Sequence, residues 1–223
     1  MCSNFEPITR KHEKWVWDKF QCELPFGDWN DQIYPNMTSP IVLLKDGKAS
    51  CVLANFGLIL FWAANKPRFG THTYNARSDD GIASKPSFRN AWKKCQFSLA
   101  LMQSFYEPYY EEGNKKSMRW RIMRRDKAPI AIASIWESYI DKDSGEIIFS
   151  QSLLTINANG HPVMQQFHKP GDEKRTIVAL EDSQYLPWLH ATLGNVSDFL
   201  RLTDDDFLVS EPSPLKKAIS ASR

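Results

Sequence analysis

The sequence predicts a single, mainly β domain of the α+β class. Short apolar or alternating runs outnumber helical patterns along the 223 residues, and ten glycines and thirteen prolines mark turns between them. Many strands with a few interspersed helices are typical of this class. No Ser/Gly/Pro-rich linker divides the chain, so we expect one domain over residues 2–210. Residues 211–223 have little to bury and are expected to form a mobile tail.

The predicted strands are short apolar runs or stretches with period-two alternation. They cover residues 41–44, 50–54, 58–62, 97–102, 147–155 and 176–180. Two further strands, 117–125 and 130–136, flank the turn sequence Asp126-Lys127-Ala128-Pro129. This arrangement predicts that these two strands pair with each other as a hairpin.

Helical spacing is clearest after Pro86-Ser87, which is a helix-start signal. The apolar residues that follow recur at i, i+3, i+4 and i+7, and they are Phe88, Ala91, Trp92 and Cys95. Weaker helical patterns cover residues 10–20, 162–168, 183–191 and 195–202. We therefore expect a few helices placed between the strands.

Composition and charge exclude several classes of protein. A hydrophobic content of 42% and a charged content of 24% are ordinary for a globular chain. The net charge of +2 is too small to indicate a nucleic-acid-binding protein by itself. The longest apolar run, 52–64, is shorter than the roughly 20 residues of a membrane helix. The N-terminus has no signal-peptide pattern, and the four cysteines form no CxxC pair, so we expect a cytoplasmic protein.

Cys2 is the first candidate for chemistry. Removal of Met1 leaves a residue with a free α-amine and a thiol two carbons apart. The amine, with a pKa of roughly 7.7–8.0, attacks aldehydes when neutral, and the thiol then closes a thiazolidine ring. Alternatively, the thiol attacks an amide with the amine as its base. A third interpretation is that a cysteine at this position has no chemical role.

Basic and aromatic residues alternate around the predicted hairpin. On a strand, Arg119 and Arg121 share one face, opposite Trp120. Such an arrangement suits a phosphate backbone with stacked bases. A solvated strand face over a core tryptophan explains the pattern equally well.

The remaining motifs argue against a metal or a cofactor. The five histidines show no HExxH or other paired metal spacing, so no metal site is expected. No Walker motif, GxGxxG or GxSxG occurs, which leaves no cofactor to expect. His161 and His168 flank a short predicted helix, and either is a possible general acid or a polar surface residue.

Short motifs follow one another in order from residue 2 to about residue 180. They are Met1-Cys2-Ser3-Asn4-Phe5, residues 57–63 (GLILFWA), 75–79 (NARSD), 84–89 (SKPSFR), 104–108 (SFYEP), 134–137 (SIWE), 155–159 (TINAN), Phe167-His168 and 174–178 (KRTIV). Each motif is weak alone. As an ordered set they resemble the SOS-response-associated peptidase (SRAP) family of abasic-site processing proteins.

The resemblance implies a fold and a function. The implied fold has curved antiparallel sheets or a barrel with a few flanking helices. The implied function belongs to the SOS response and DNA repair: a monomer, associated with the nucleoid and not with membranes, recognises abasic sites in single-stranded DNA. It forms a thiazolidine crosslink through its N-terminal cysteine. AP-lyase activity and self-processing, which removes Met1, also belong to this implied function.

By match to the family motifs, four residues carry the chemistry. Cys2 forms the crosslink, and Asn75 positions or polarises the amine and the sugar. Glu107 is the acid/base that opens the sugar ring. His168 is the second proton donor, in strand cleavage or in reversal of the crosslink.

Three further residues match positions that bind DNA. Arg77 and Lys85 are expected to hold phosphates. Trp62 is expected to offer a stacking face beside the lesion. Phosphate contacts of this kind need no base sequence.

The chain also departs from the family pattern. Ser3-Asn4 stand where the family has Gly-Arg, so one phosphate or base contact beside the nucleophile is missing. An insertion before His168 makes His161 a rival for the histidine role. Two other functions stay open: an N-terminal cysteine amide hydrolase or peptidase, and a non-catalytic module that binds single-stranded DNA.

Overall fold

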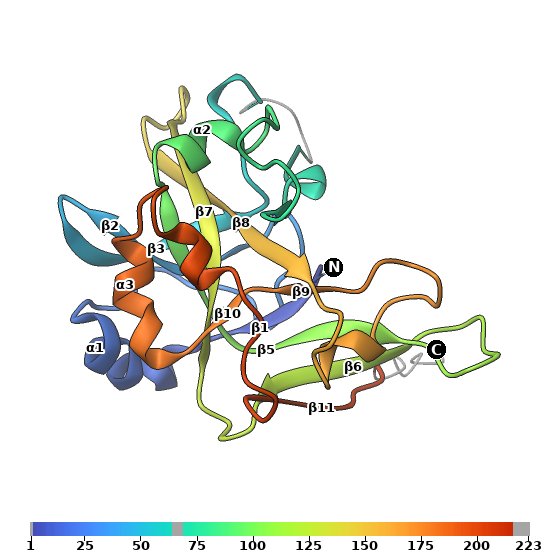
Figure 1. Cartoon of the computed structure of the whole chain (residues 1–223). Helices are drawn as coiled ribbons and strands as arrows, with labels where there is room; N and C mark the ends of the chain where they lie inside the picture. The colour runs from blue at the N-terminus through green and yellow to red at the C-terminus, as the bar shows by residue number, and fades with distance from the viewer. Residues whose placement is uncertain (1, 64–68, 216–223) are drawn as a thin grey trace, which may run out of the picture.

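The computed structural model describes residues 2–63 and 69–215, and a closed barrel of five strands forms its centre (Figure 1). The strands are β1 (Phe5–Pro7), β2 (Thr38–Lys45), β3 (Lys48–Phe56), β4 (Asn75–Arg77), β5 (Phe97–Tyr109), β6 (Met118–Arg124), β7 (Ile130–Ile140), β8 (Ile147–Asn157), β9 (Arg175–Ile177), β10 (Ala179–Leu180) and β11 (Leu208–Pro212). Neighbours pair in the order β7-β8-β3-β2-β5, and β5 pairs with β7 to close the ring. The mainly β, α+β fold with a barrel is therefore confirmed.

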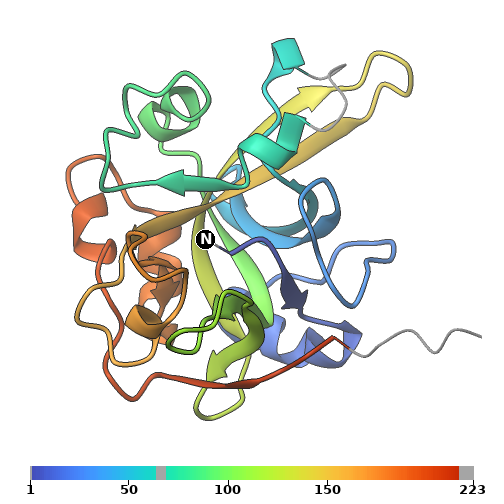
Figure 2. The same cartoon turned by 90° about the vertical axis from the view of Figure 1, so that its right-hand side faces the viewer.

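Most pairs in the barrel are antiparallel, and one is parallel. The parallel pair is β3 with β8. Outside the ring, β1 pairs with β5, while β4 and β9 both pair with β8. Figure 2 shows that the first described residues lie at the centre of one face, close to these short strands. The short strands thus bring the N-terminal segment to the residues of β4 and β5.

Helices are short and pack against one part of the barrel (Figure 1). In the described residues they are α1 (Glu13–Phe20), α2 (Arg89–Lys93) and α3 (Tyr185–Leu189), with 3₁₀ turns at Arg10–His12, Phe61–Ala63, Phe69–His72, Met164–Gln166, Asp182–Gln184 and Val196–Phe199. Phe20, Trp92 and Trp188 lie in one hydrophobic cluster with the barrel strands. The predicted helices at 10–20 and 88–95 are confirmed, with the second one shorter than expected.

A second hydrophobic cluster surrounds the N-terminus. It contains Cys2, Phe5, Phe56 and Phe105, all with no exposed surface. The rings of Phe5 and Phe56 meet edge to face, with centroids 5.1 Å apart. Burial of these side chains fixes the start of the chain against β5.

The predicted strand at 58–62 is wrong. The chain leaves the sheet at Gly57, whose φ of +119° lies in a region that favours glycine. A Cβ atom here would collide with the carbonyl oxygen of Gly70. Because Gly70 is distant in sequence from Gly57, no local sequence pattern predicts the close approach of these two residues.

Gly57→Ala is expected to lower the free energy of unfolding by about 3 kcal/mol, because it adds a backbone clash to a strained φ. Gly47→Ala is the matched control. Gly47 has a φ of +76° but open space around it, so its variant measures backbone strain alone. Urea titrations compare the two variants, and equal losses of stability would contradict the clash.

The predicted hairpin between 117–125 and 130–136 is also wrong. The turn exists, with Lys127 at a φ of 63°, but β6 and β7 both pair with β5. β7 pairs with residues 97–102 of β5, and β6 pairs with residues 105–109. A 13-residue strand is long enough to serve both partners in succession.

Two further boundaries differ from the prediction. The predicted helix at 162–168 is one 3₁₀ turn, Met164–Gln166, and His168 follows it with a left-handed φ of 67°. Glu211 and Pro212 were expected in the tail, but they end β11 and pair with β6. Residues 216–223 of the expected tail lie outside the described residues.

Candidate active site

Cys2 lies at the start of the chain with its side chain completely buried. Its Sγ lies 3.5 Å from the carbonyl oxygen of Asn4, to which the thiol donates. Burial raises the pKa of this thiol well above its usual range, and the carboxyl of Glu107 raises it further. The thiol therefore stays protonated at neutral pH.

Asn75 holds the backbone of Cys2 in place. Its strand, β4, runs parallel to β8, with Asn75 opposite Leu153. The side-chain Nδ2 of Asn75 donates to the carbonyl oxygen of Cys2 over 2.8 Å. The Oδ1 atom is buried and has no hydrogen-bond partner among the described residues. An amide oxygen left in this state is an acceptor available to a donor beside Cys2.

Glu107 and His168 form an acid–imidazole pair. Glu107 projects from β5 and is 2% exposed, and its Oε2 lies 3.6 Å from Nδ1 of His168. The backbone N–H of His168 donates to the carbonyl of Pro108 over 2.9 Å, which fixes the loop to β5. Nε2 of His168 donates to the carbonyl of Arg175 over 2.8 Å, so Nδ1 is left to face Glu107.

Burial raises the pKa of Glu107, and the N-terminal amine and the imidazole of His168 oppose this effect only in part. A carboxyl group in this environment keeps its proton to a higher pH than an ordinary glutamate does. It is therefore suited to give a proton to a reacting oxygen near neutral pH.

The raised pKa of Glu107 predicts a loss of stability as pH rises. A carboxyl whose pKa is raised by folding stabilises the protein fully below its ordinary pKa of 4.5. This contribution is lost as pH rises through the folded-state pKa. The variant Glu107→Gln has no carboxyl group to titrate at this position. As the pH rises above 4.5, the Tm of this variant should therefore increase relative to the Tm of the unaltered protein. The measurement is thermal unfolding across a range of pH, with a variant of the exposed Glu146, Glu146→Gln, as the control. A Tm difference between Glu107→Gln and the unaltered protein that does not change with pH would contradict the prediction.

Tyr74 is a site residue that sequence reasoning missed. Burial raises the pKa of its phenol, and the nearby Cys2 thiol and Glu107 carboxyl raise it further. Its ring meets Phe56 edge to face, with centroids 5.5 Å apart. The available signal was its position directly before Asn75 in the motif.

The side chain of His161 has a structural role, because both of its ring nitrogens bond to neighbouring groups. It is 2% exposed, and its Nδ1 accepts the backbone N–H groups of Val163 and Met164, both over 3.1 Å. Its Nε2 lies 3.1 Å from Oγ1 of Thr203. Both ring nitrogens are thus used to hold the turn. Of the two histidines, His168 is the one whose ring faces Glu107.

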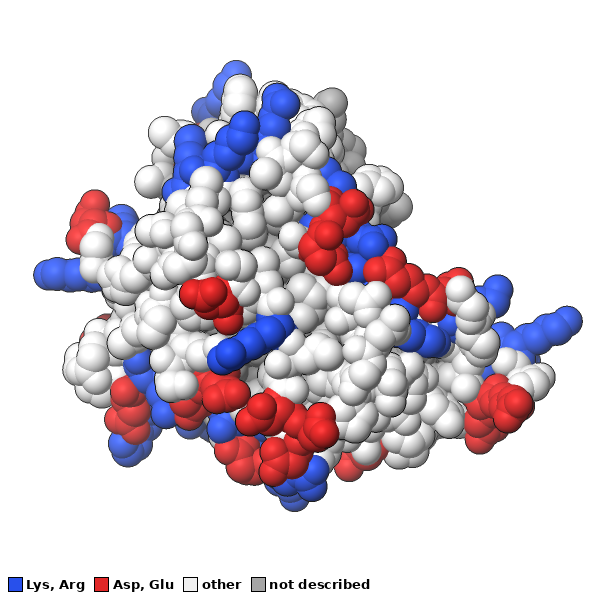
Figure 3. Space-filling view, in the orientation of Figure 1, with Lys and Arg blue, Asp and Glu red and all other residues white. Residues whose placement is uncertain are grey.

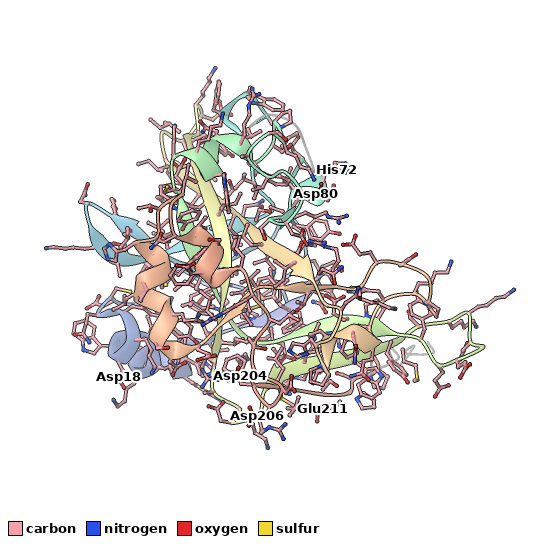
Figure 4. All side chains as sticks on the ribbon, in the orientation of Figure 1. Asp18, His72, Asp80, Asp204, Asp206 and Glu211 are labelled. Carbon is pink, nitrogen blue, oxygen red and sulfur yellow. The ribbon has the colours of Figure 1, made fainter. Side chains whose placement is uncertain are left out.

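The cations expected to hold phosphates are paired with acidic side chains. Nη2 of Arg77 lies 2.6 Å from Oε2 of Glu173, and Nζ of Lys85 lies 2.9 Å from Oδ2 of Asp80, which Figure 4 labels. Over the same face, acidic and basic side chains lie next to one another (Figure 3). Phosphates must therefore displace these carboxylates to reach the two cations.

Trp62 projects from the turn Phe61–Ala63 and is 51% exposed. Its ring meets Phe69 edge to face, with centroids 5.4 Å apart. The indole of Trp62 is thus half exposed, and exposed aromatic surface is the kind on which bases stack.

A pocket of about 420 Å³ opens beside the acid–imidazole pair. Ser3 and Asn4 line it from the N-terminal segment, Tyr106 and Glu107 from β5, and Arg119 from β6. Ser3 and Asn4 directly follow Cys2 in the sequence, and Cys2 itself is buried and does not line the pocket. The pocket is large enough to hold a sugar with a neighbouring phosphate.

Across residues 2–63 and 69–215, no group of three His, Cys, Asp or Glu side chains is placed to hold a metal ion. None of the helices in this part of the chain is long and apolar enough to cross a membrane.

Comparison with known proteins places this geometry in a family. A crystal structure of a protein from Bordetella bronchiseptica matches with a TM-score of 0.82 and 29% identity, over 96% of this chain and 100% of that one. One from Bacteroides thetaiotaomicron matches with a TM-score of 0.77 and 20% identity, over 95% of this chain and 91% of that one. A crystal structure of a phage-related protein from Bordetella bronchiseptica matches with a TM-score of 0.66 and 15% identity, over 95% of this chain and 94% of that one.

The second and third of these likenesses concern the fold alone. No curated protein sequence matches the chain. The family model described as SOS response associated peptidase (SRAP) matches residues 1–212, and the chain therefore belongs to this family.

Proposed function

We propose that the protein captures abasic sites in single-stranded DNA as a covalent adduct of Cys2. Membership of the SRAP family supports a DNA-damage-related function associated with the SOS response, and with it contact with DNA. The observation that carries the finer proposal is the convergence on Cys2. Asn75 holds its carbonyl at 2.8 Å, and the Glu107 carboxyl acts on its thiol electrostatically.

The proposed reaction begins after hydrolytic removal of Met1. The α-amine of Cys2 attacks C1 of the ring-opened sugar, and the aldehyde oxygen leaves as water, which gives an imine. The thiol then adds to the imine carbon while its proton passes to the imine nitrogen. The products are a thiazolidine and one water molecule, with no oxidant or reductant consumed.

The state of the thiol supports this order of events. A protonated thiol is a weak nucleophile, so the amine reacts first and the thiol second. An amide hydrolase with Cys2 as nucleophile needs a thiolate for its first step. The aldehyde reaction differs in that the amine, not the thiol, makes the first attack.

The neighbouring residues take the roles that the motifs assign. Glu107, which burial keeps protonated, gives its proton to the sugar ring oxygen and takes back the proton of the C1 hydroxyl as the ring opens. It then gives that proton to the departing hydroxyl of the amine adduct. The unpartnered Oδ1 of Asn75 accepts an N–H of the Cys2 amine and orients its lone pair. His168 exchanges protons through Nδ1, the ring nitrogen that faces Glu107.

DNA binding in this proposal uses Arg77, Lys85 and Trp62. The two cations exchange their carboxylate partners for phosphates, and the exposed indole stacks on a base beside the lesion. A purely non-catalytic DNA-binding module uses the same surface, but it leaves no covalent product.

The test is a denaturing gel of the protein mixed with single-stranded DNA that carries one abasic site. Intact mass, measured beforehand, establishes that the chain begins at Cys2. A shifted band that survives denaturation supports the proposal. The absence of an adduct from protein that begins at Cys2 would overturn it, and the hydrolase and the simple DNA-binding module would replace it.

A further inference from the structure

Arg119 is an arginine of β6 that lines the pocket beside Glu107. Its Cζ lies 3.2 Å from the centroid of the Tyr106 ring, so the guanidinium stacks on an aromatic face. Nη2 donates to Oδ1 of Asn4 over 2.7 Å and to Oε1 of Gln32 over 3.0 Å. Nη1 donates to the carbonyl of Ser213 over 3.3 Å. These contacts fix the group at the pocket wall.

The charge of Arg119 is not neutralised. Its acceptors are all uncharged oxygens, and within the described part of the chain it forms no ion pair. These bonds use three of the five N–H donors that an arginine carries. The remaining two donors have no hydrogen-bond partner within the described part of the chain.

The next arginine on the same strand face shows the contrast. Nη2 of Arg121 lies 2.7 Å from Oε2 of Glu6, and its Nη1 lies 3.9 Å from Oε1 of Glu211, which Figure 4 labels. Arg77 and Lys85 are neutralised in the same way. Arg119 therefore differs from these cations in keeping a full charge toward the pocket.

Asn4 explains why this arginine is placed here. Its Nδ2 donates to the carbonyl of Ile33 over 3.2 Å, and its Oδ1 accepts from Arg119. Asn4 is 6% exposed, so it offers little surface for direct contact with a ligand. Its role is to orient the guanidinium, at the position where the family pattern has an arginine.

We propose that Arg119 binds a phosphate of single-stranded DNA next to the captured abasic residue and so replaces the arginine missing at position 4. This inference rests on the proposed function. A stacked, pre-oriented guanidinium with free donors suits a phosphate oxygen. Arg119 and Glu107 line the same pocket, so a phosphate bound by Arg119 lies on the same side of the molecule as the proposed acid of the reaction.

The experiment separates this inference from the chemistry at Cys2. The probe is a labelled single-stranded oligonucleotide with one tetrahydrofuran residue, which mimics an abasic site but has no aldehyde and forms no adduct. Fluorescence anisotropy at several salt concentrations compares the unaltered protein with Arg119→Gln, Arg119→Lys and Arg201→Gln. Arg201 is exposed and does not line the pocket, so its variant controls for net charge.

We expect Arg119→Gln to weaken binding by roughly tenfold and to lower the slope of log K against log salt by about 0.7, the value for one phosphate of a single strand. Arg119→Lys should keep the salt slope but not the full affinity, because lysine lacks the planar fork. Arg201→Gln should bind like the unaltered protein.

Three results would overturn the inference. One is unchanged affinity in Arg119→Gln, and another is an equal loss in Arg201→Gln. The third concerns inorganic phosphate, whose binding is measured by calorimetry. If Arg119→Gln loses phosphate binding but keeps DNA binding, the site is one for free phosphate. If aldehyde DNA gives no adduct but tetrahydrofuran DNA still depends on Arg119, the proposed function fails and the phosphate contact stands.

Discussion

Cys2→Ala is expected to abolish the denaturation-resistant adduct with abasic DNA and to leave non-covalent binding intact. Alanine keeps the α-amine, so an imine still forms, but without a thiol it stays open to hydrolysis. The adduct should therefore fall to background on a denaturing gel. Binding of a tetrahydrofuran oligonucleotide should change little, because the fully buried Cys2 side chain offers no surface to a phosphate.

Borohydride separates the role of the amine from that of the thiol. Reduction converts the imine into a stable secondary amine, so Cys2→Ala should regain a gel-stable adduct when borohydride is present. The unaltered protein should form its adduct with or without the reductant. This pair of results would show amine attack followed by thiol closure, which is the order that the raised thiol pKa favours.

Cys95→Ala is the matched control, since Cys95 is a free, half-buried cysteine outside this site. It should form the adduct normally. A persistent adduct in Cys2→Ala without borohydride would contradict the assignment of the thiol. Failure of borohydride to trap that variant would contradict the assignment of the amine.

Local patterns in the sequence predicted most of the barrel. Strands β2, β3, β5, β7 and β8 follow apolar or alternating runs, and α2 follows the helical spacing of Phe88, Ala91 and Trp92. The errors in the predicted strands arise where contacts between residues distant in sequence determine the path of the chain. Gly57 turns the chain because Gly70 lies against it, and β6 pairs with β5 because β7 occupies the other half of that long strand.

The candidate site shows the same limit. Family motifs nominated Cys2, Asn75, Glu107 and His168, but only the fold joins Asn75 to Cys2 across 73 positions. Spacing in the sequence carries no information on such a contact. The bond between Asn4 and Arg119 spans 115 positions, so a departure from the family motif at position 4 gave no hint of its compensation.

Replacement of His168 is expected to slow strand cleavage by roughly 100-fold, the scale of a lost general acid–base group. In the lyase step a proton leaves C2′ of the imine and the 3′ phosphate departs, so a group that accepts and returns protons limits the rate. His168→Asn is the better variant, since His168 has a φ of 67°, which asparagine tolerates and alanine does not. Single-turnover cleavage across pH measures the effect.

His161→Ala is the matched comparison for this prediction. It leaves two backbone N–H groups of the turn without their acceptor, so we expect a stability loss of about 1–3 kcal/mol and a cleavage rate within a few-fold of normal. The two variants should thus separate rate from stability, because one ring faces Glu107 and the other holds a turn. The opposite ranking of cleavage rates would assign the proton transfer to His161 and require a different alignment across the insertion.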